Sequence, residues 1–188
     1  MFGGTLTEPL TWVRAVHYAS MVQLVGVFAF LSFVAEPTLG RLQEPDPSAF
    51  SRLRVRLIRL AWLSLATGFV SGALWLFFVA ADMSGQPLGR LLSDNIIVTV
   101  LTRTQFGRVW QLRFVLAVIL IVCLVTLGAD RRGARAVVRQ MVGLLLSAGD
   151  LGTLAWAGHA RGTAGFAGAV HLSSDVIHLL AAGTWLVS

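Results

Sequence analysis

Residues 109–127 read VWQLRFVLAVILIVCLVTL, and this stretch decides the class of protein to which the chain belongs. Its only charged side chain is that of Arg113. A helix needs about 20 mostly apolar residues to cross a hydrocarbon core of about 30 Å. The stretch is therefore predicted to be a membrane-spanning helix.

The rest of the chain has the same character. Of its 188 residues, 56% are hydrophobic and 13% are charged, and the mean hydropathy of +0.76 is far above that of an ordinary soluble domain. Further candidate spans are residues 12–35, 60–81, 137–157 and 170–187. We therefore expect an all-α fold, a polytopic membrane helical bundle of about five transmembrane helices, with residues 1–188 forming a single transmembrane domain.

The arginines indicate how the chain is oriented. All 15 basic residues are arginines and the formal net charge is +6, a balance that can accompany nucleic-acid binding. Here, however, the arginines form short clusters between apolar runs, which is the pattern that sets membrane topology, so we expect no nucleic-acid partner. The clusters lie mainly in the first and third connections: Arg41, Arg52, Arg54, Arg56 and Arg59, then Arg131, Arg132, Arg135 and Arg139.

These two connections are predicted to be cytoplasmic, because short cytoplasmic loops carry an excess of arginine. The N-terminus is then outside. In the first connection, Asp46-Pro47-Ser48 predicts the start of a helix, since it combines capping residues with a proline that suits a first turn.

The second connection, residues 82–108, is then an outer loop, although it holds Arg90, Arg103 and Arg108. Apolar residues recur in it at helical spacing, which predicts an amphipathic segment in or near the membrane surface: Leu91, Leu92, Ile96, Ile97, Val100 and Leu101. Tryptophans fall near the outer ends of the spans and predict an aromatic belt there: Trp12, Trp75, Trp110 and Trp156.

All the histidines are predicted to lie toward the outer side of the membrane. His171, Asp175 and His178 occur at positions i, i+4 and i+7, which places them on one face of a helix. His159 ends the preceding span, and His17 reaches a similar depth in the first span. Ionisable groups at membrane depth are costly, so a cluster of them predicts a functional site.

The residue types favour a metal site. Imidazole is a ligand for copper, zinc, iron and nickel, and Asp175 can complete a coordination shell or accept a proton from a ligating histidine. Met21 lies one turn beyond His17 and would favour a soft ion such as Cu(I), although core packing is the more common role of methionine. The predicted metal ligands are His17, Met21, His159, His171, Asp175 and His178.

Asp150 is a second acid at membrane depth. It lies nine residues before His159 and therefore falls on the opposite side of the same helix. We expect it to form a structural ion pair, with Arg113 or Arg14 as its partner.

Two stretches are similar to a known family. Residues 156–185, WAGHARGTAGFAGAVHLSSDVIHLLAAGTW, resemble the signature of the copper-resistance D proteins (CopD/PcoD-like), which are bacterial inner-membrane proteins. Residues 104–113, TQFGRVWQLR, resemble the Thr-x-Phe-Gly-x-x-Trp-x-x-Arg stretch of that family, and His17 has a counterpart in it. The resemblance covers essentially the whole chain. Family members continue with further helices after the TWLVS that ends this sequence, so the chain resembles the N-terminal portion of a longer architecture.

The resemblance implies a copper-binding protein of the bacterial inner membrane, involved in copper resistance and homeostasis. It implies that copper is taken from the periplasm and moved into the cytoplasm, alongside a periplasmic copper-binding protein. The residues that would handle the ion are His159, His171, Asp175 and His178, joined by His17, with Phe106, Gly107 and Trp110 shaping the outer rim.

Two other functions fit the residues. A haem b electron carrier is possible in principle, because histidines on neighbouring helices can supply two axial ligands, but Asp175 would need its own partner in an apolar haem pocket. In a structural or assembly subunit, the histidines would only bond neighbouring helices. The sequence has no phosphate-binding glycine loop and no nucleophile elbow, so we expect no enzyme activity.

Overall fold

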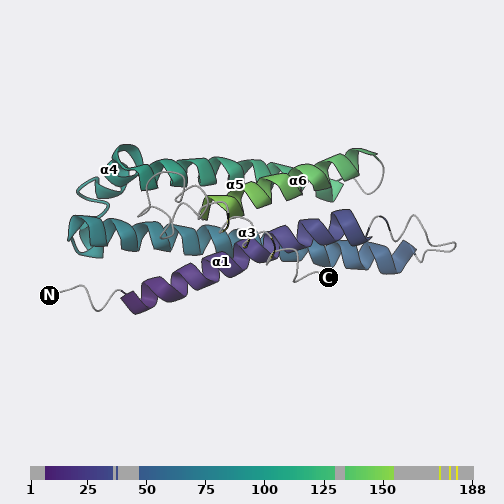
Figure 1. Ribbon diagram of the computed structural model, residues 1–188, viewed down its shortest axis with the longest axis horizontal. Coiled ribbons are helices and arrows are strands. Elements are labelled where there is room, and N and C mark those ends of the chain that lie inside the picture. Colours follow the sequence, from purple (N-terminus) through teal and green to yellow (C-terminus); the bar gives the residue numbers. More distant parts are fainter. Residues whose placement is uncertain are drawn as a thin grey trace.

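The computed structural model describes residues 7–35, 37, 47–129 and 134–154, together with 174, 178 and 181. Throughout these residues the regular structure is helical, and Figure 1 shows the long helices running side by side. The elements are α1 (Thr7–Phe30), which continues as the π-helix η1 (Leu31–Ala35), α3 (Pro47–Ser84), the short 3-10 helix η2 (Leu88–Arg90), α4 (Ile96–Arg103), α5 (Gln105–Ala129) and α6 (Ala134–Thr153).

Three segments of the described chain are long and apolar enough to cross a membrane: Glu8–Ala35, Ser48–Ser84 and Gln105–Leu127. They contain the first three predicted spans and confirm the predicted all-α membrane bundle. The predicted fourth span, residues 137–157, overlaps α6 (Ala134–Thr153), which is not one of these three segments. The predicted fifth span, residues 170–187, lies outside the described residues except for single helical positions at 174, 178 and 181.

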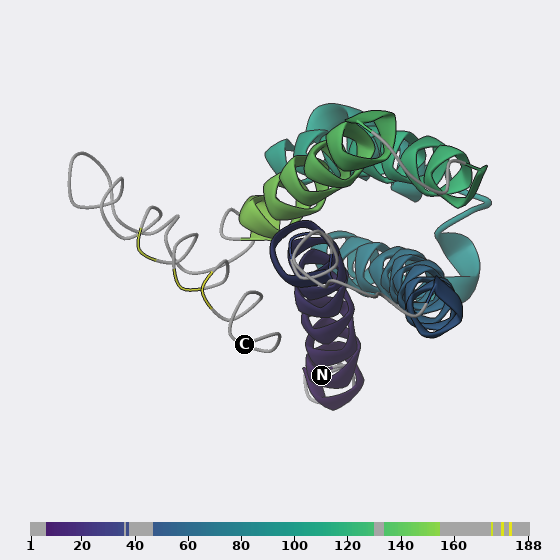
Figure 2. The same cartoon turned by 90° about the vertical axis from the view of Figure 1, so that its right-hand side faces the viewer.

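The helices are arranged in two pairs. Helix α1 packs along α3, α5 packs along α6, and α1 also contacts α6 where the two pairs meet (Figures 1 and 2). The largest buried cluster joins α1, α3 and α5, and it includes Leu24, Phe28, Leu31, Ala61, Leu65, Leu120, Leu124 and Leu127. Since lipid is as apolar as these side chains, close packing holds such helices together more than the exclusion of water does.

A glycine sets the distance between α1 and α6. A Cβ atom at Gly143 would lie only 2.2 Å from Cε1 of Phe28, and the Phe28 side chain is fully buried. The absence of a side chain therefore lets the two backbones approach each other. Asp150 follows seven residues later on the same face of α6, so this approach also brings its carboxylate toward α1.

Helix α3 begins at Pro47, as predicted, and is longer than the membrane requires. Its 38 residues extend for about 57 Å, whereas the hydrocarbon core is about 30 Å thick. The predicted span began only at residue 60, so the arginines between Pro47 and that point lie on a continuation of the same helix and not on a loop.

Arginine contacts explain why this continuation is ordered. The side chain of Arg54 is buried and donates a 3.0 Å hydrogen bond to the carbonyl oxygen of Leu127 in α5. Arg139 of α6 donates a 3.1 Å hydrogen bond to the carbonyl oxygen of Thr126. Both acceptors belong to the last turn of α5, whose carbonyl groups have no partner within the helix. The two arginines thus cap α5 and tie α3 and α6 to its end.

The second connection contains the predicted amphipathic segment as the short helix α4. Its apolar side does not face lipid alone, because Val100 and the preceding Leu91 are buried against Ala80 and Ala81 of α3. Helix α4 also sits tightly on the first turn of α5, where a Cβ at Gly107 would lie 2.2 Å from the carbonyl oxygen of Val100. This packing fixes where α5 begins.

Candidate functional site

The polar centre of the bundle is built around His17 of α1. Its side chain is 2% exposed, and its Nδ1 atom lies 2.9 Å from the carbonyl oxygen of Gly68 and 3.1 Å from Oγ of Ser71, both on α3. Glycines make this approach possible, since a Cβ at Gly72 would lie 3.1 Å from Cε1 of His17. The imidazole is therefore held directly against the backbone of α3.

The second ring nitrogen of His17 contacts α5. Nε2 accepts a hydrogen bond from the guanidinium group of Arg113. Because a guanidinium group can only donate, Nε2 must carry the lone pair, and the proton lies on Nδ1, which donates to Gly68. Ser71 agrees with this assignment, since its own hydroxyl donates to the carbonyl oxygen of Thr67 at 2.7 Å and leaves its oxygen free to accept from Nδ1. His17 is a neutral imidazole with both nitrogens engaged.

Arg113 also meets a carboxylate from α6. Its Nε atom lies 3.5 Å from Oδ1 of Asp150, and each of the two side chains is 5% exposed. Within the described part of the chain, Oδ1 has no hydrogen-bond partner, so the attraction between the two groups is electrostatic. The predicted ion pair of Asp150 is confirmed with Arg113, whereas Arg14 lies over the ring of Trp75, 5.2 Å from its centroid. We refer to His17, Arg113 and Asp150 as the central network.

Two tryptophans enclose the central network. The ring of Trp75 lies edge-on to His17 at a centroid distance of 5.6 Å, and the ring of Trp110 lies 5.9 Å from His17. Cζ of Arg113 lies 5.0 Å above the ring of Trp110, within the range of a cation–π interaction. The prediction of a surface belt is wrong for Trp75, which is only 2% exposed, and Trp110 packs inward. Trp12 is on the surface, at 73% exposed, and the fourth predicted belt residue, Trp156, lies outside the described residues.

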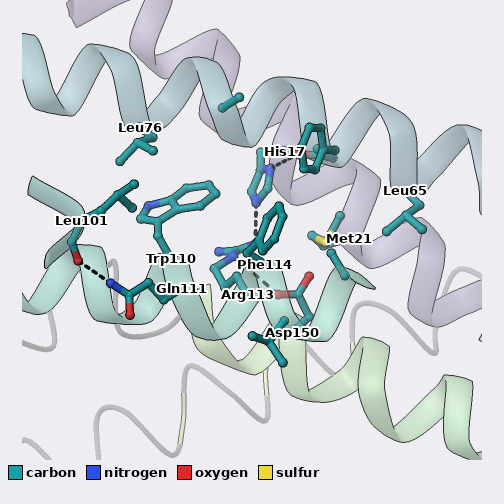
Figure 3. A pocket seen from close by; sticks show the side chains of 15 residues that line it. His17, Met21, Leu65, Leu76, Leu101, Trp110, Gln111, Arg113, Phe114 and Asp150 are labelled. Carbon is teal, nitrogen blue, oxygen red and sulfur yellow. Dashed lines mark hydrogen bonds and ion pairs between the residues drawn. The ribbon is translucent and has the colours of Figure 1, made fainter. Parts of the chain in front are cut away.

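A cavity of about 530 Å³ opens beside the central network, between the pairs of helices. Figure 3 shows Met21 together with all three members of the network at its wall. The remainder of the wall is almost entirely apolar and aromatic and includes Leu65, Phe69, Leu76, Leu101, Trp110 and Phe114. The site therefore combines one neutral imidazole, one ion pair and one thioether in an apolar chamber.

The structure brings together two of the predicted metal ligands, His17 and Met21. His178 is helical and exposed. The other three, His159, His171 and Asp175, lie outside the described residues. In the described ranges, no group of three or more histidine, cysteine, aspartate or glutamate side chains is placed to hold a metal ion. The metal-ligand set as a whole stays a prediction.

Sequence reasoning missed the link between His17 and Arg113. The signal was present, because Arg113 is the only charged residue in the stretch 109–127 and Asp150 is an acid at membrane depth. A charge in such a position must find partners inside the bundle. The spacing of residues along one helix, however, does not show which other helices face it.

Comparison with known proteins identifies the family. The family described as "Copper resistance protein D-like, N-terminal domain" matches residues 5–169. The chain is 28% identical over 177 residues to the "Inner membrane protein YebZ" of Escherichia coli (strain K12), an alignment that covers 93% of this chain and 54% of that protein. The chain thus spans about half the length of this relative. No solved structure gives a significant match. By the extent of the family match, this membrane protein belongs to the copper resistance protein D-like N-terminal domain family.

Proposed function

We propose that this chain binds copper in the membrane and moves it from the periplasm toward the cytoplasm, as part of copper resistance. Family membership supports copper as the cargo. The observation that carries the proposal is that His17 and Met21 line one cavity between helices long enough to span a membrane. Imidazole and thioether groups are both copper ligands, and the thioether favours Cu(I).

The proposed path has two stages. In the predicted topology, His159 and the His171–Asp175–His178 face meet the ion first, at the periplasmic side, after delivery by a periplasmic copper-binding protein. The ion then passes to the cavity beside His17. The description of the relative as an inner membrane protein supports the same location for this chain. Copper is the cargo in this proposal, and the chain is a carrier and not an enzyme.

The first test removes the proposed entry ligands. In the His171→Asn/His178→Asn variant, we expect purified protein to lose most of its bound copper and cells to lose copper uptake, because asparagine cannot replace the imidazole lone pair. Elemental analysis of the purified protein and uptake of a copper isotope measure the two effects. The matched control is Asp94→Asn, which changes an exposed residue of the outer loop. Unchanged copper content and uptake in the double variant would contradict the proposal, and a strong Soret band from the purified wild type would point to haem instead.

A further inference from the structure

Three groups that attract a positive charge converge on the guanidinium group of Arg113. Nε2 of His17 accepts a hydrogen bond from it, and Oδ1 of Asp150 lies 3.5 Å from its Nε atom. The indole ring of Trp110 lies beneath it, 5.0 Å from Cζ to the ring centroid. Figure 3 shows how Arg113 stands between the imidazole and the carboxylate, with Met21 facing the same space.

The same groups would suit a soft metal cation. An imidazole lone pair and a thioether are ligand types for Cu(I), the carboxylate is a harder ligand whose main contribution is its negative charge, and an aromatic face attracts cations in general. Oδ1 of Asp150 is buried and has no hydrogen-bond partner among the described residues, so the guanidinium group leaves its lone pairs partly unused. The ligands come from two directions, His17 and Met21 from α1 and Asp150 from α6.

We propose that the guanidinium group of Arg113 is a tethered cation that closes a second, membrane-embedded Cu(I) site formed by His17, Met21 and Asp150, and that an entering ion must displace it. The choice of copper as the ligand rests on the proposed function. The site shares His17 and Met21 with the predicted ligand set and adds Asp150, and it does not use His159, His171, Asp175 or His178.

The balance between the charges of Arg113 and Asp150 would control how tightly the site holds copper. Arg113 and Asp150 together are neutral, and a second positive charge in the same low-dielectric chamber is costly unless the guanidinium group withdraws. Copper therefore occupies the site weakly and leaves it readily while Arg113 is present. Without the guanidinium group, Asp150 would stand unpaired, and a monovalent cation would neutralise it.

The experiment titrates the full chain, purified in detergent, with Ag⁺ as a redox-inert stand-in for Cu(I). All proteins carry His171→Asn and His178→Asn, which removes two of the proposed entry ligands and leaves any contribution of His159 and Asp175 the same in every variant. In this background, Arg113→Gln is expected to bind Ag⁺ at least about tenfold more tightly than the parent, because the competing charge is gone. Adding His17→Gln should abolish the gain.

Two further variants separate charge from packing. Arg113→Lys keeps a positive charge and is expected to leave the affinity at the parent value, although it alters the side chain. Arg108→Gln removes an exposed charge from the same helix and is expected to have no effect. Melting temperature and gel-filtration profile show whether each variant is folded.

The proposal is overturned if Arg113→Gln binds no more tightly than the parent, or if its gain survives His17→Gln. Should Arg113→Gln fail to fold because Asp150 is left unpaired, Arg113→Gln/Asp150→Asn removes both charges and keeps His17 and Met21. That variant frees Nε2 of His17 but lacks the carboxylate, so a smaller gain in Ag⁺ affinity over the parent is expected, and no gain there counts against the proposal. The proposed function is tested separately, by the loss of copper from the His171→Asn/His178→Asn variant. The proposed function and the role of Arg113 can therefore fail independently.

Discussion

At the scale of single residues, His17 is the contact point of three helices. Through Nδ1 it bonds the backbone of α3, and through Nε2 it accepts from Arg113 on α5, which in turn pairs with Asp150 on α6. A histidine in an apolar span can hold helices together in this way only while it is neutral and has acceptors and donors on opposite sides. His17 is therefore a structural connector, and in the proposal above it becomes a metal ligand only when Arg113 withdraws.

Removing Asp150 should be costly for stability. Asp150→Ala leaves the buried guanidinium group of Arg113 without its counter-charge, and the free energy of unfolding is expected to fall by about 3–5 kcal/mol. Arg113→Met/Asp150→Leu, which removes both charges, should recover most of that loss. Chemical unfolding in detergent measures the differences, with Asp94→Ala as an exposed control expected to change stability by no more than about 0.5 kcal/mol. A double variant as unstable as Asp150→Ala would show that the pairing is not what holds this region together.

At the scale of elements, the fold depends on close contact between helices at glycines. Gly143 of α6 packs directly on the ring of Phe28 in α1, and Gly68 and Gly72 of α3 admit Met21 and His17 from α1. Helix packing in membranes favours small residues because they bring backbones together. The contacts at Gly68 and Gly72 also position Met21 and His17 at the cavity wall, and the contact at Gly143 brings the face of α6 that carries Asp150 toward α1.

Two glycines of the same helix give a matched comparison. Gly143→Ala is expected to reduce stability by about 1–3 kcal/mol, because its Cβ would clash with the fully buried Phe28 ring. Gly149→Ala, whose Cβ would have no neighbour within 4 Å, should be neutral or gain about 0.5–1 kcal/mol from better helix propensity. Thermal unfolding of the two variants measures both stability changes. Equal changes at the two positions would argue against tight α1–α6 packing.

At the scale of the whole molecule, the charge distribution predicts the orientation. The arginine-bearing start of α3 and the capped end of α5 lie at one end of the bundle, joined by the bond from Arg54 to Leu127. That end should be cytoplasmic, because arginine is enriched in cytoplasmic connections. The start of α1 then lies in the periplasm.

Single cysteines can report this orientation. In a Cys123→Ala background, a membrane-impermeant thiol reagent applied to intact spheroplasts is expected to label Glu8→Cys and Arg108→Cys and to spare Arg56→Cys, since all three positions are exposed in the structure. After the membrane is permeabilised, Arg56→Cys should be labelled as well. The reverse pattern in intact spheroplasts would mean that the N-terminus is cytoplasmic.

The sequence alone predicts the spans well and the site only in part. Long apolar runs such as 109–127 have one physical explanation, and the structure confirms the first three. The pairing of Asp150 with Arg113 was also predictable, because a buried acid needs a cation and few were available. The inward packing of Trp75 and the bond between His17 and Arg113 were not, since helical periodicity gives the depth and face of a residue but not its neighbours on other helices.

The capping of α5 has a mechanical consequence for the cavity. Arg54 and Arg139 fasten the end of α5 at Leu127 and Thr126, about 20 Å along the helix from Arg113. These two hydrogen bonds hold that end of α5 against α3 and α6. A tilt of α5 relative to α3 would pivot near this clamp and would displace the turn that carries Arg113 more than the turn that carries Thr126, with α4, packed on Gly107, limiting the other end.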